Sequence, residues 1–121
     1  MRFIQESGYT VKLGQDEAHQ QWMAANEEKL GRAYPEGTRY LGTFATVLST
    51  DKQSGSYRWF VELDSYAALD RLAAAAKDAS SEFGRLNREW SAFVDYDLNA
   101  PWSQGLFKAV VDATVWDPPT G

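Results

Sequence analysis

The segment from Thr38 to Leu63 constrains the fold most, because it has the pattern of a β-hairpin whose two faces differ in chemistry. Its two halves alternate in polarity around the turn-forming run Asp51-Lys52-Gln53-Ser54-Gly55. On one face the predicted cross-strand pairs are Val47 with Trp59, Ala45 with Val61 and Thr43 with Leu63. This face is nearly dry, so we expect it to pack against a core.

The second face of the predicted hairpin mixes aromatic rings with charges. Its predicted pairs are Leu48 with Arg58, Thr46 with Phe60 and Phe44 with Glu62, and Tyr40 follows further along. A sheet face with several large apolar side chains typically marks an interaction site. We therefore expect this face to meet a cavity or a partner sheet rather than bulk water alone.

A strand and a helix are predicted before the hairpin. Tyr9, Val11 and Leu13 alternate with polar residues, which indicates a strand, and the residues from Phe3 onward are candidates to extend it. Helical spacing begins after Asp16 and ends at the run 35–37, which contains proline and glycine. The apolar stripe of this predicted helix consists of Ala18, Trp22, Met23, Ala25, the stem of Lys29, Leu30 and Ala33.

Helical spacing returns after the hairpin, over residues 65–95. The pair Asp64-Ser65 is a candidate N-cap, and Ser80 is a second one. The intervening run 78–80 is a weak break, so the pattern leaves open whether this region forms one bent helix or two. A final strand is predicted from Leu106 to Trp116, with Phe107, Ala109 and Val111 on one face and Lys108, Val110, Asp112 and Trp116 on the other.

The predicted order of elements is β-α-β-β-α-β, which is the ferredoxin-like arrangement of the α+β class. It predicts a four-stranded antiparallel sheet with helices on one face. The length of 121 residues suits one domain spanning 1–121. Helices on one side cannot cover the other side, where the pattern places Tyr40, Phe44, Phe60, Val110 and Trp116. Face-to-face pairing of two such sheets would hide these residues, so we predict a homodimer.

In its element order, its length and its two-faced strands, nearly the whole chain resembles the dimeric α+β barrel superfamily. That superfamily includes antibiotic-biosynthesis monooxygenases, EthD-like and NIPSNAP-like proteins, small polyketide cyclases and stress-responsive barrels, and no motif assigns the branch. The resemblance implies an organic ligand held between sheet and helices or inside the barrel. It also implies, for some branches, oxidation or cyclisation without a cofactor, and for another branch haem bound through a histidine.

Composition excludes several kinds of partner. The net charge is −5 and the basic residues do not cluster, which disfavours binding to nucleic acid and to acidic membrane surfaces. The absence of cysteine excludes disulfides and thiolate catalysis. Neither a secretion signal nor an apolar run of about 20 residues is visible, so we expect a cytoplasmic protein with no membrane span.

Neither a cofactor nor a metal ion is expected. The only histidine, His19, lies among glutamines on the first predicted helix, so we interpret it as a solvated surface residue rather than a haem ligand. The run 95–99 begins like a calcium loop, but Ala100 replaces the turn glycine and Leu106 replaces the required glutamate.

The charged residues predicted on the second sheet face are Arg58, Glu62, Lys108 and Asp112. In one interpretation they are catalytic, with Glu62 or Asp112 as the base and Arg58 stabilising a developing oxyanion. In the other, which we favour, Arg58–Glu62 and Lys108–Asp112 are ion pairs that fix the register of a dimer.

Six residues are predicted to contact a ligand: Tyr40, Phe44, Phe60, Trp90, Trp102 and Lys108. Trp90 would line any pocket between helix and sheet, and Trp102 would cover a pocket or the partner subunit. These observations predict a homodimer that binds an aromatic or apolar metabolite. As an enzyme it would catalyse a cofactor-independent oxidation, isomerisation or cyclisation. The alternative is a non-catalytic barrel protein whose inner face serves only dimerisation.

Overall fold

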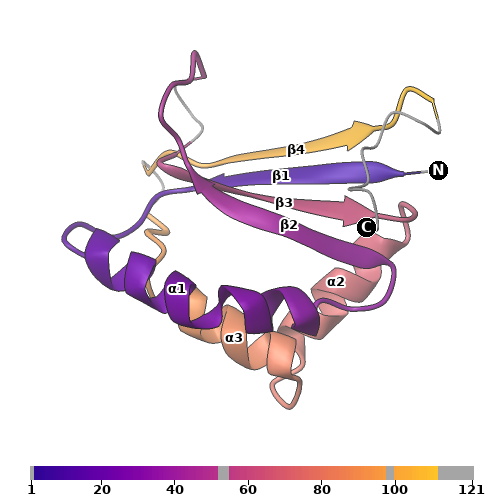
Figure 1. Ribbon diagram of the computed structural model, residues 1–121, viewed down its shortest axis with the longest axis horizontal. Helices are drawn as coiled ribbons and strands as arrows, with labels where there is room; N and C mark the ends of the chain where they lie inside the picture. Colours follow the sequence, from indigo (N-terminus) through magenta and orange to yellow (C-terminus); the bar gives the residue numbers. More distant parts are fainter. Residues whose placement is uncertain (1, 52–54, 98–99, 112–121) are drawn as a thin grey trace, which may run out of the picture.

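A computed structural model describes residues 2–51, 55–97 and 100–111 of the chain. These residues form one four-stranded antiparallel sheet and three helices (Figure 1). The strands are β1 (Phe3–Tyr9), β2 (Thr38–Ala45), β3 (Tyr57–Leu63) and β4 (Ser103–Lys108), in the spatial order β2-β3-β1-β4. The helices are α1 (Asp16–Ala33), α2 (Ala68–Lys77) and α3 (Glu82–Ser91). This confirms the predicted ferredoxin-like fold of the α+β class.

All three helices lie on one side of the sheet, and the other side is uncovered by any described element (Figure 1). The strand face that the helices cover carries Tyr57, Val61 and Leu63, which are buried. Val61 and Leu63 pack with Phe3 and Ala68 in one cluster, and Tyr57 packs with Tyr9 and Val94 in another. The uncovered side is called the open face below; it carries Ile4, Glu6, Phe44, Arg58, Phe60, Glu62 and Phe107.

The region after β3 forms two helices, which answers the question left open by the sequence. α2 ends at Lys77, because Asp78 adopts an extended conformation. Ser81 is the N-cap of α3, and its Oγ accepts a hydrogen bond from the Gly84 N–H at 2.9 Å. Two capping predictions were therefore wrong. The cap of α3 is Ser81 rather than Ser80, and α2 begins at Ala68, beyond the predicted caps at 64–65.

Within the paired strands Thr43, Phe44 and Ala45 keep their predicted faces, but the predicted register is wrong, and Val47 and Leu48 lie beyond the end of β2 and are exposed. Thr43 pairs with Trp59 and Phe44 pairs with Arg58, so each residue lies opposite a partner four positions from the predicted one. Because four is an even number, the paired residues keep their faces. The cause is a long connection, since β2 ends at Ala45 and β3 begins only at Tyr57.

A β-bulge between Tyr40 and Gly42 changes the side on which Tyr40 lies. Leu41 is the extra residue, so alternation is interrupted and Tyr40 pairs with Val61 on the helix-covered side. The prediction that Tyr40 lies on the same face as Phe44 was therefore wrong. Gly42 has a φ of 134° and lies beneath the Phe44 ring, where a Cβ would come within 3.1 Å of that ring.

The terminal strands are also displaced from their predicted positions. β1 ends at Tyr9, and Val11 forms only an isolated bridge with Val94. β4 begins at Ser103, and within it Phe107 pairs with Ile4 on the open face while Lys108 pairs with Phe3 on the helix side. The predicted open-face position of Lys108 was therefore wrong. The predicted residues Asp112 and Trp116 lie outside the described residues.

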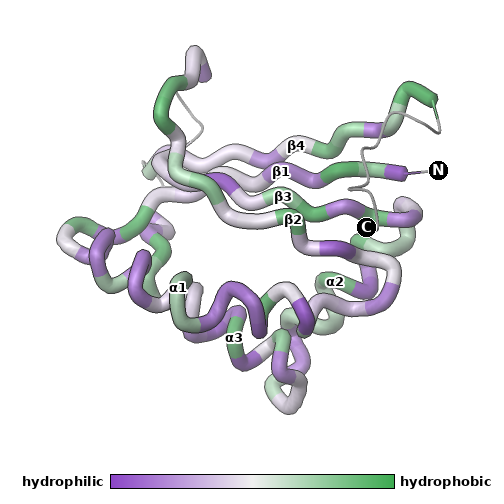
Figure 2. The backbone as a smooth tube through the Cα atoms, in the orientation of Figure 1, coloured by the Kyte–Doolittle hydropathy of each residue, from purple (hydrophilic) through white to green (hydrophobic). Residues whose placement is uncertain are grey.

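Figure 2 shows hydrophobic segments that project from both ends of the sheet, after β2 and after β4. They contain Val47, Leu48, Val110 and Val111, all of which are exposed. Among the described residues, no helix has both the length and the apolar character required to cross a bilayer.

A candidate ligand cavity between sheet and helices

A cavity of about 610 Å³ lies between the sheet and the helices. Its walls come from all four strands, from all three helices, and from the segment between α3 and β4. Ligand pockets of proteins commonly measure about 300–1,000 Å³. The aromatic residues that line it are Tyr9, Tyr34, Tyr40, Trp59, Phe83, Trp90, Tyr96 and Trp102.

One wall of the cavity is a group of three rings, contributed by Tyr9, Trp59 and Trp90. The ring centroid of Tyr9 lies 4.9 Å from that of Trp90 and 5.5 Å from that of Trp59. Trp59 and Trp90 meet edge to face at 5.0 Å. Such packed rings present a rigid apolar surface to a ligand.

The opposite end of the cavity is formed by Tyr34, Tyr40 and Phe83. Tyr34 stacks on Tyr40 at 5.2 Å and meets Phe83 edge to face at 4.7 Å. The Tyr40 hydroxyl donates to Glu27 Oε1 at 3.0 Å and also contacts Thr43 Oγ1. Burial raises the pKa of both Tyr34 and Tyr40, so both phenols are neutral at ordinary pH.

Polar groups gather where the segment after α3 meets the end of β1. The Asp95 N–H donates to the Thr10 carbonyl at 2.8 Å, and the Thr10 hydroxyl donates to the Pro101 carbonyl at 2.8 Å. Tyr96 and Trp102, which are about two-thirds exposed, lie at this part of the cavity wall. The partly exposed rings of Tyr96 and Trp102 therefore lie in the same part of the cavity wall as Asp95 and Thr10.

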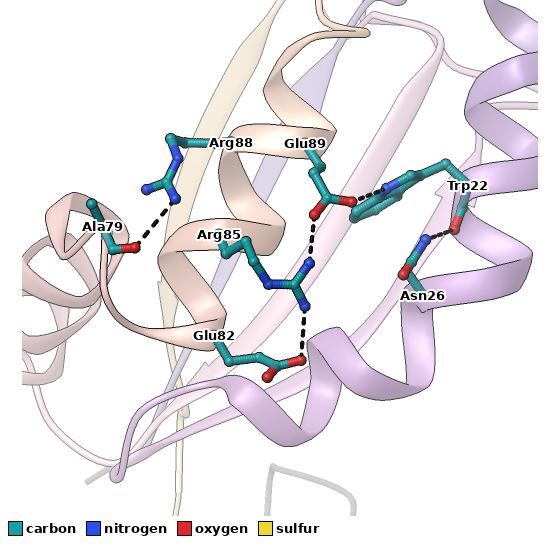
Figure 3. Close-up of polar contacts among 7 residues, drawn as sticks. All are labelled: Trp22, Asn26, Ala79, Glu82, Arg85, Arg88 and Glu89. Carbon is teal, nitrogen blue, oxygen red and sulfur yellow. Dashed lines mark hydrogen bonds and ion pairs between the residues drawn. The ribbon is translucent and has the colours of Figure 1, made fainter.

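A polar contact on the outer surface joins α3, which carries Trp90 and Phe83, to α1, and ion pairs within α3 adjoin it (Figure 3). The Trp22 Nε1–H donates to Glu89 Oε1 at 3.1 Å, and Arg85 donates to the other oxygen of Glu89 at 2.6 Å. Arg85 also reaches Glu82 at 3.1 Å. Trp22–Glu89 therefore links the two helices outside the cavity, and Arg85 orients the Glu89 carboxylate.

His19 is buried, so its interpretation as a solvated residue was wrong. It is only 1% exposed, and its Nε2 lies 2.7 Å from the Tyr9 hydroxyl. Burial lowers the pKa of His19, so its imidazole is neutral at pH 7. The helical spacing could have predicted the burial of His19. This residue precedes Met23 by four residues and Leu30 by eleven, and all three lie on the buried side of α1.

The charged residues of the open face pair differently from the prediction. Arg58 lies 3.6 Å from Glu6, and Arg39 lies 2.7 Å from Glu62, so no Arg58–Glu62 pair forms. The Ser103 hydroxyl also donates to Glu6, at 3.2 Å. Arg58 and Glu62 are on the side of the sheet opposite the cavity.

The predicted ligand contacts therefore divide among three places. Tyr40, Trp90 and Trp102 line the cavity, Phe44 and Phe60 lie on the open face, and Lys108 belongs to neither group. Sequence reasoning missed Tyr9 and Trp59 as cavity residues, because an inward-facing ring on a strand has the same alternation whether it fills a core or borders a cavity. The described residues hold no cluster of three or more acidic or histidine side chains suited to a metal ion.

No family model matches the sequence, and no curated protein matches it. The fold is similar to that of an uncharacterised NIPSNAP-like domain protein from Burkholderia xenovorans, with a TM-score of 0.64 and 11% identity over 97% of this chain and 96% of that one. It is also similar to a dabb family protein with a ferredoxin-like fold from Mesorhizobium loti (TM-score 0.59, 11% identity, 88% and 95% covered). A third similar structure is a putative antibiotic biosynthesis monooxygenase from Nitrosomonas europaea (TM-score 0.57, 12% identity, 92% of each chain). The chain therefore has the ferredoxin-like fold of NIPSNAP, dabb and monooxygenase-like proteins, as the resemblance predicted, and its branch is unassigned.

Proposed function

We propose that this protein binds a flat, largely apolar small molecule in the cavity between its sheet and its helices. The observation that carries the proposal is the cavity of about 610 Å³ with aromatic walls. Its volume suits a molecule of two or three fused rings, and edge-to-face and stacked contacts with aromatic walls favour a flat ligand. A few polar side chains, including Ser7, Asn87 and Asp95, line the same cavity and would orient such a molecule.

We also propose that two copies of the chain pair through the open face. Phe44 and Phe107 are more than half exposed there, and Phe60 meets the Phe44 ring at 5.8 Å. Ion pairs between strands, Arg58–Glu6 and Arg39–Glu62, border these rings. In this arrangement the charges set the register of the pair, which is the interpretation that the sequence favours over catalysis by Arg58 and Glu62.

As an enzyme the protein would act on the molecule in the cavity without a cofactor, by oxidation, isomerisation or cyclisation. The likeness in fold to a putative monooxygenase supports this class but carries no chemistry by itself. A non-catalytic binding or dimerisation role is the alternative, and absence of turnover with retained binding would favour it.

Filling the cavity is the direct test of binding. Ala73 lines the cavity and its neighbour Ala74 does not, although both are exposed residues of α2. 2-Naphthol is a suitable probe, because it is flat, apolar and able to quench tryptophan emission by energy transfer. We expect Ala73→Trp to weaken 2-naphthol binding by roughly tenfold or more, a change of about 1.4 kcal/mol per tenfold.

Ala74→Trp is the matched control, since it adds the same ring to the same helix outside the cavity. It should bind 2-naphthol with the affinity of the unmodified protein. Equal weakening by both variants, or no saturable binding by the unmodified protein, would contradict the proposed site. Far-UV circular dichroism of both variants verifies that α2 is intact.

A further inference from the structure

A buried pair of titratable groups begins at the wall of the cavity, with Tyr9, and continues behind it, with His19. Tyr9 borders the cavity directly, and its hydroxyl lies 2.7 Å from His19 Nε2. His19 lies behind Tyr9, on α1, and is not itself a lining residue. Tyr9 is therefore the connection between a bound molecule and the only histidine of the chain.

A second tyrosine and a carboxylate stand behind this pair. The Tyr57 ring lies 4.5 Å from the His19 ring, and the Tyr57 hydroxyl donates to Asp16 Oδ1 at 2.8 Å. Asp16 favours the protonated form of His19 through its charge, whereas burial favours the neutral form more strongly. The imidazole is thus neutral at rest, with a nearby carboxylate that would stabilise it once it gained a proton.

A further property sets His19 apart from an ordinary core residue. Its Nδ1 is buried and has no hydrogen-bond partner among the described residues. Leaving a buried polar atom unpaired costs roughly 1–3 kcal/mol. An apolar side chain of similar size would avoid that cost but would remove the partner of the buried Tyr9 hydroxyl, so the contact with Tyr9 is what calls for an imidazole here.

We propose that Tyr9 and His19 form a proton relay that deprotonates a weak carbon or oxygen acid bound in the cavity. This inference rests on the proposed binding function and assigns chemistry to the same cavity. For an aromatic ketone, the C–H bond next to the carbonyl breaks and its electron pair forms the enolate. The proton passes to the Tyr9 oxygen while the Tyr9 proton moves to His19 Nε2. The reverse transfer restores the ketone, and in D₂O it delivers deuterium once the proton held by the relay has exchanged with solvent, so the step needs no oxidant and no cofactor.

In this relay Tyr9 is the catalytic residue, because it touches the substrate, and His19 is the terminal proton acceptor acting through it. The groups that face His19 are Tyr9 from β1, Tyr57 from β3 and Asp16 from its own helix, together with the apolar Phe93 ring after α3. Burial raises the pKa of Tyr9, so this phenol does not ionise on its own and has to pass its proton to His19.

Hydrogen–deuterium exchange into 2-tetralone tests the relay without an oxidant. This ketone has the fused-ring shape of 2-naphthol, and loss of its C1 proton signal in D₂O under argon is followed by NMR. We expect the protein to accelerate exchange, and His19→Gln to lower the accelerated rate by roughly 100-fold. His19→Gln retains a hydrogen-bonding partner for Tyr9 but cannot accept a proton, so it should still bind 2-naphthol. Tyr9→Phe should lose exchange as well, whereas Tyr66→Phe, which removes an exposed phenol outside the cavity, should not.

The pH profile of the unmodified protein gives a test that needs no variant. Because the pKa of His19 is lowered from 6.5, the neutral acceptor dominates above that value. After correction for the hydroxide-catalysed background, the exchange rate should therefore stay constant down to about pH 6.5, the unperturbed pKa of histidine, and fall only at a lower pH, where His19 gains its proton. Binding of 2-naphthol with no accelerated exchange, or equal exchange by His19→Gln, would overturn the relay and leave the binding site standing. Failure of 2-naphthol to bind would overturn both proposals.

Discussion

Replacing Gly84 with alanine should destabilise the protein by about 3 kcal/mol or more, although alanine is the better helix former. Gly84 is a buried residue in the first turn of α3. A Cβ at this position would lie 2.1 Å from the carbonyl oxygen of Asp78, where α2 ends. That oxygen belongs to the backbone of the tight connection between the helices, so relief requires α2 and α3 to separate. The separation would disturb Phe83 and Leu86, which are buried in the same helix.

Gly31→Ala in α1 is the matched control, and we expect it to act in the opposite direction. A Cβ there would meet the Tyr40 ring at 3.4 Å, which is ordinary contact. The gain in helix propensity should stabilise the protein by about 0.5–1 kcal/mol. Thermal and urea unfolding measure both changes in stability. Gly84→Ala should lower the midpoint of thermal unfolding by about 10 °C. If Gly84→Ala proved as stable as Gly31→Ala, the close approach of α2 and α3 would be wrong.

Strand faces were predictable from the sequence because alternation is a local property. Arg58, Phe60 and Glu62 lie on one side of β3 whatever strand is paired with it. Register is not local, since it depends on where the connection between β2 and β3 ends. The bulge at Leu41 is also invisible to alternation, and it alone moved Tyr40 from the open face to the cavity.

The cavity could be predicted only in part, for a related reason. Trp90 was recognised as a residue that would line a pocket between helix and sheet, and it does line one. His19 was misjudged because its polar neighbours in sequence suggested exposure, whereas its position on α1 places it behind Tyr9. The ion-pair partners of Arg58 and Glu62 depend on the order of the strands. That order places Glu6 of β1 beside Arg58 and Arg39 of β2 beside Glu62.

Replacing Phe60 with aspartate should abolish pairing of two copies if the open face is the dimer interface. Phe60 lies in the middle of β3, opposite Glu6 on one neighbouring strand and Gly42 on the other. In a two-fold interface both subunits contribute the same patch, so each substitution appears twice. A carboxylate at the centre of the patch is therefore buried near the identical carboxylate of the partner. A buried and unpaired carboxylate costs several kcal/mol, and the new charge also lies near Glu6 and Glu62. We therefore expect a monomer by analytical ultracentrifugation at concentrations where the unmodified protein is a dimer.

Leu13→Asp is the matched control for this experiment. It makes the same kind of change, from an apolar side chain to a carboxylate, at a fully exposed residue of the turn before α1, which lies on the helical side of the molecule (Figure 1). The Leu13 variant should remain a dimer. At a protein concentration low enough for the unmodified protein to be monomeric, both variants should unfold at the same midpoint as the unmodified protein, which would show that the core is intact. Binding of 2-naphthol by monomeric Phe60→Asp would also show that the cavity is complete within one chain, since none of the open-face rings Phe44, Phe60 and Phe107 lines it. A dimer that survives Phe60→Asp would mean that the two sheets do not pair through Phe60.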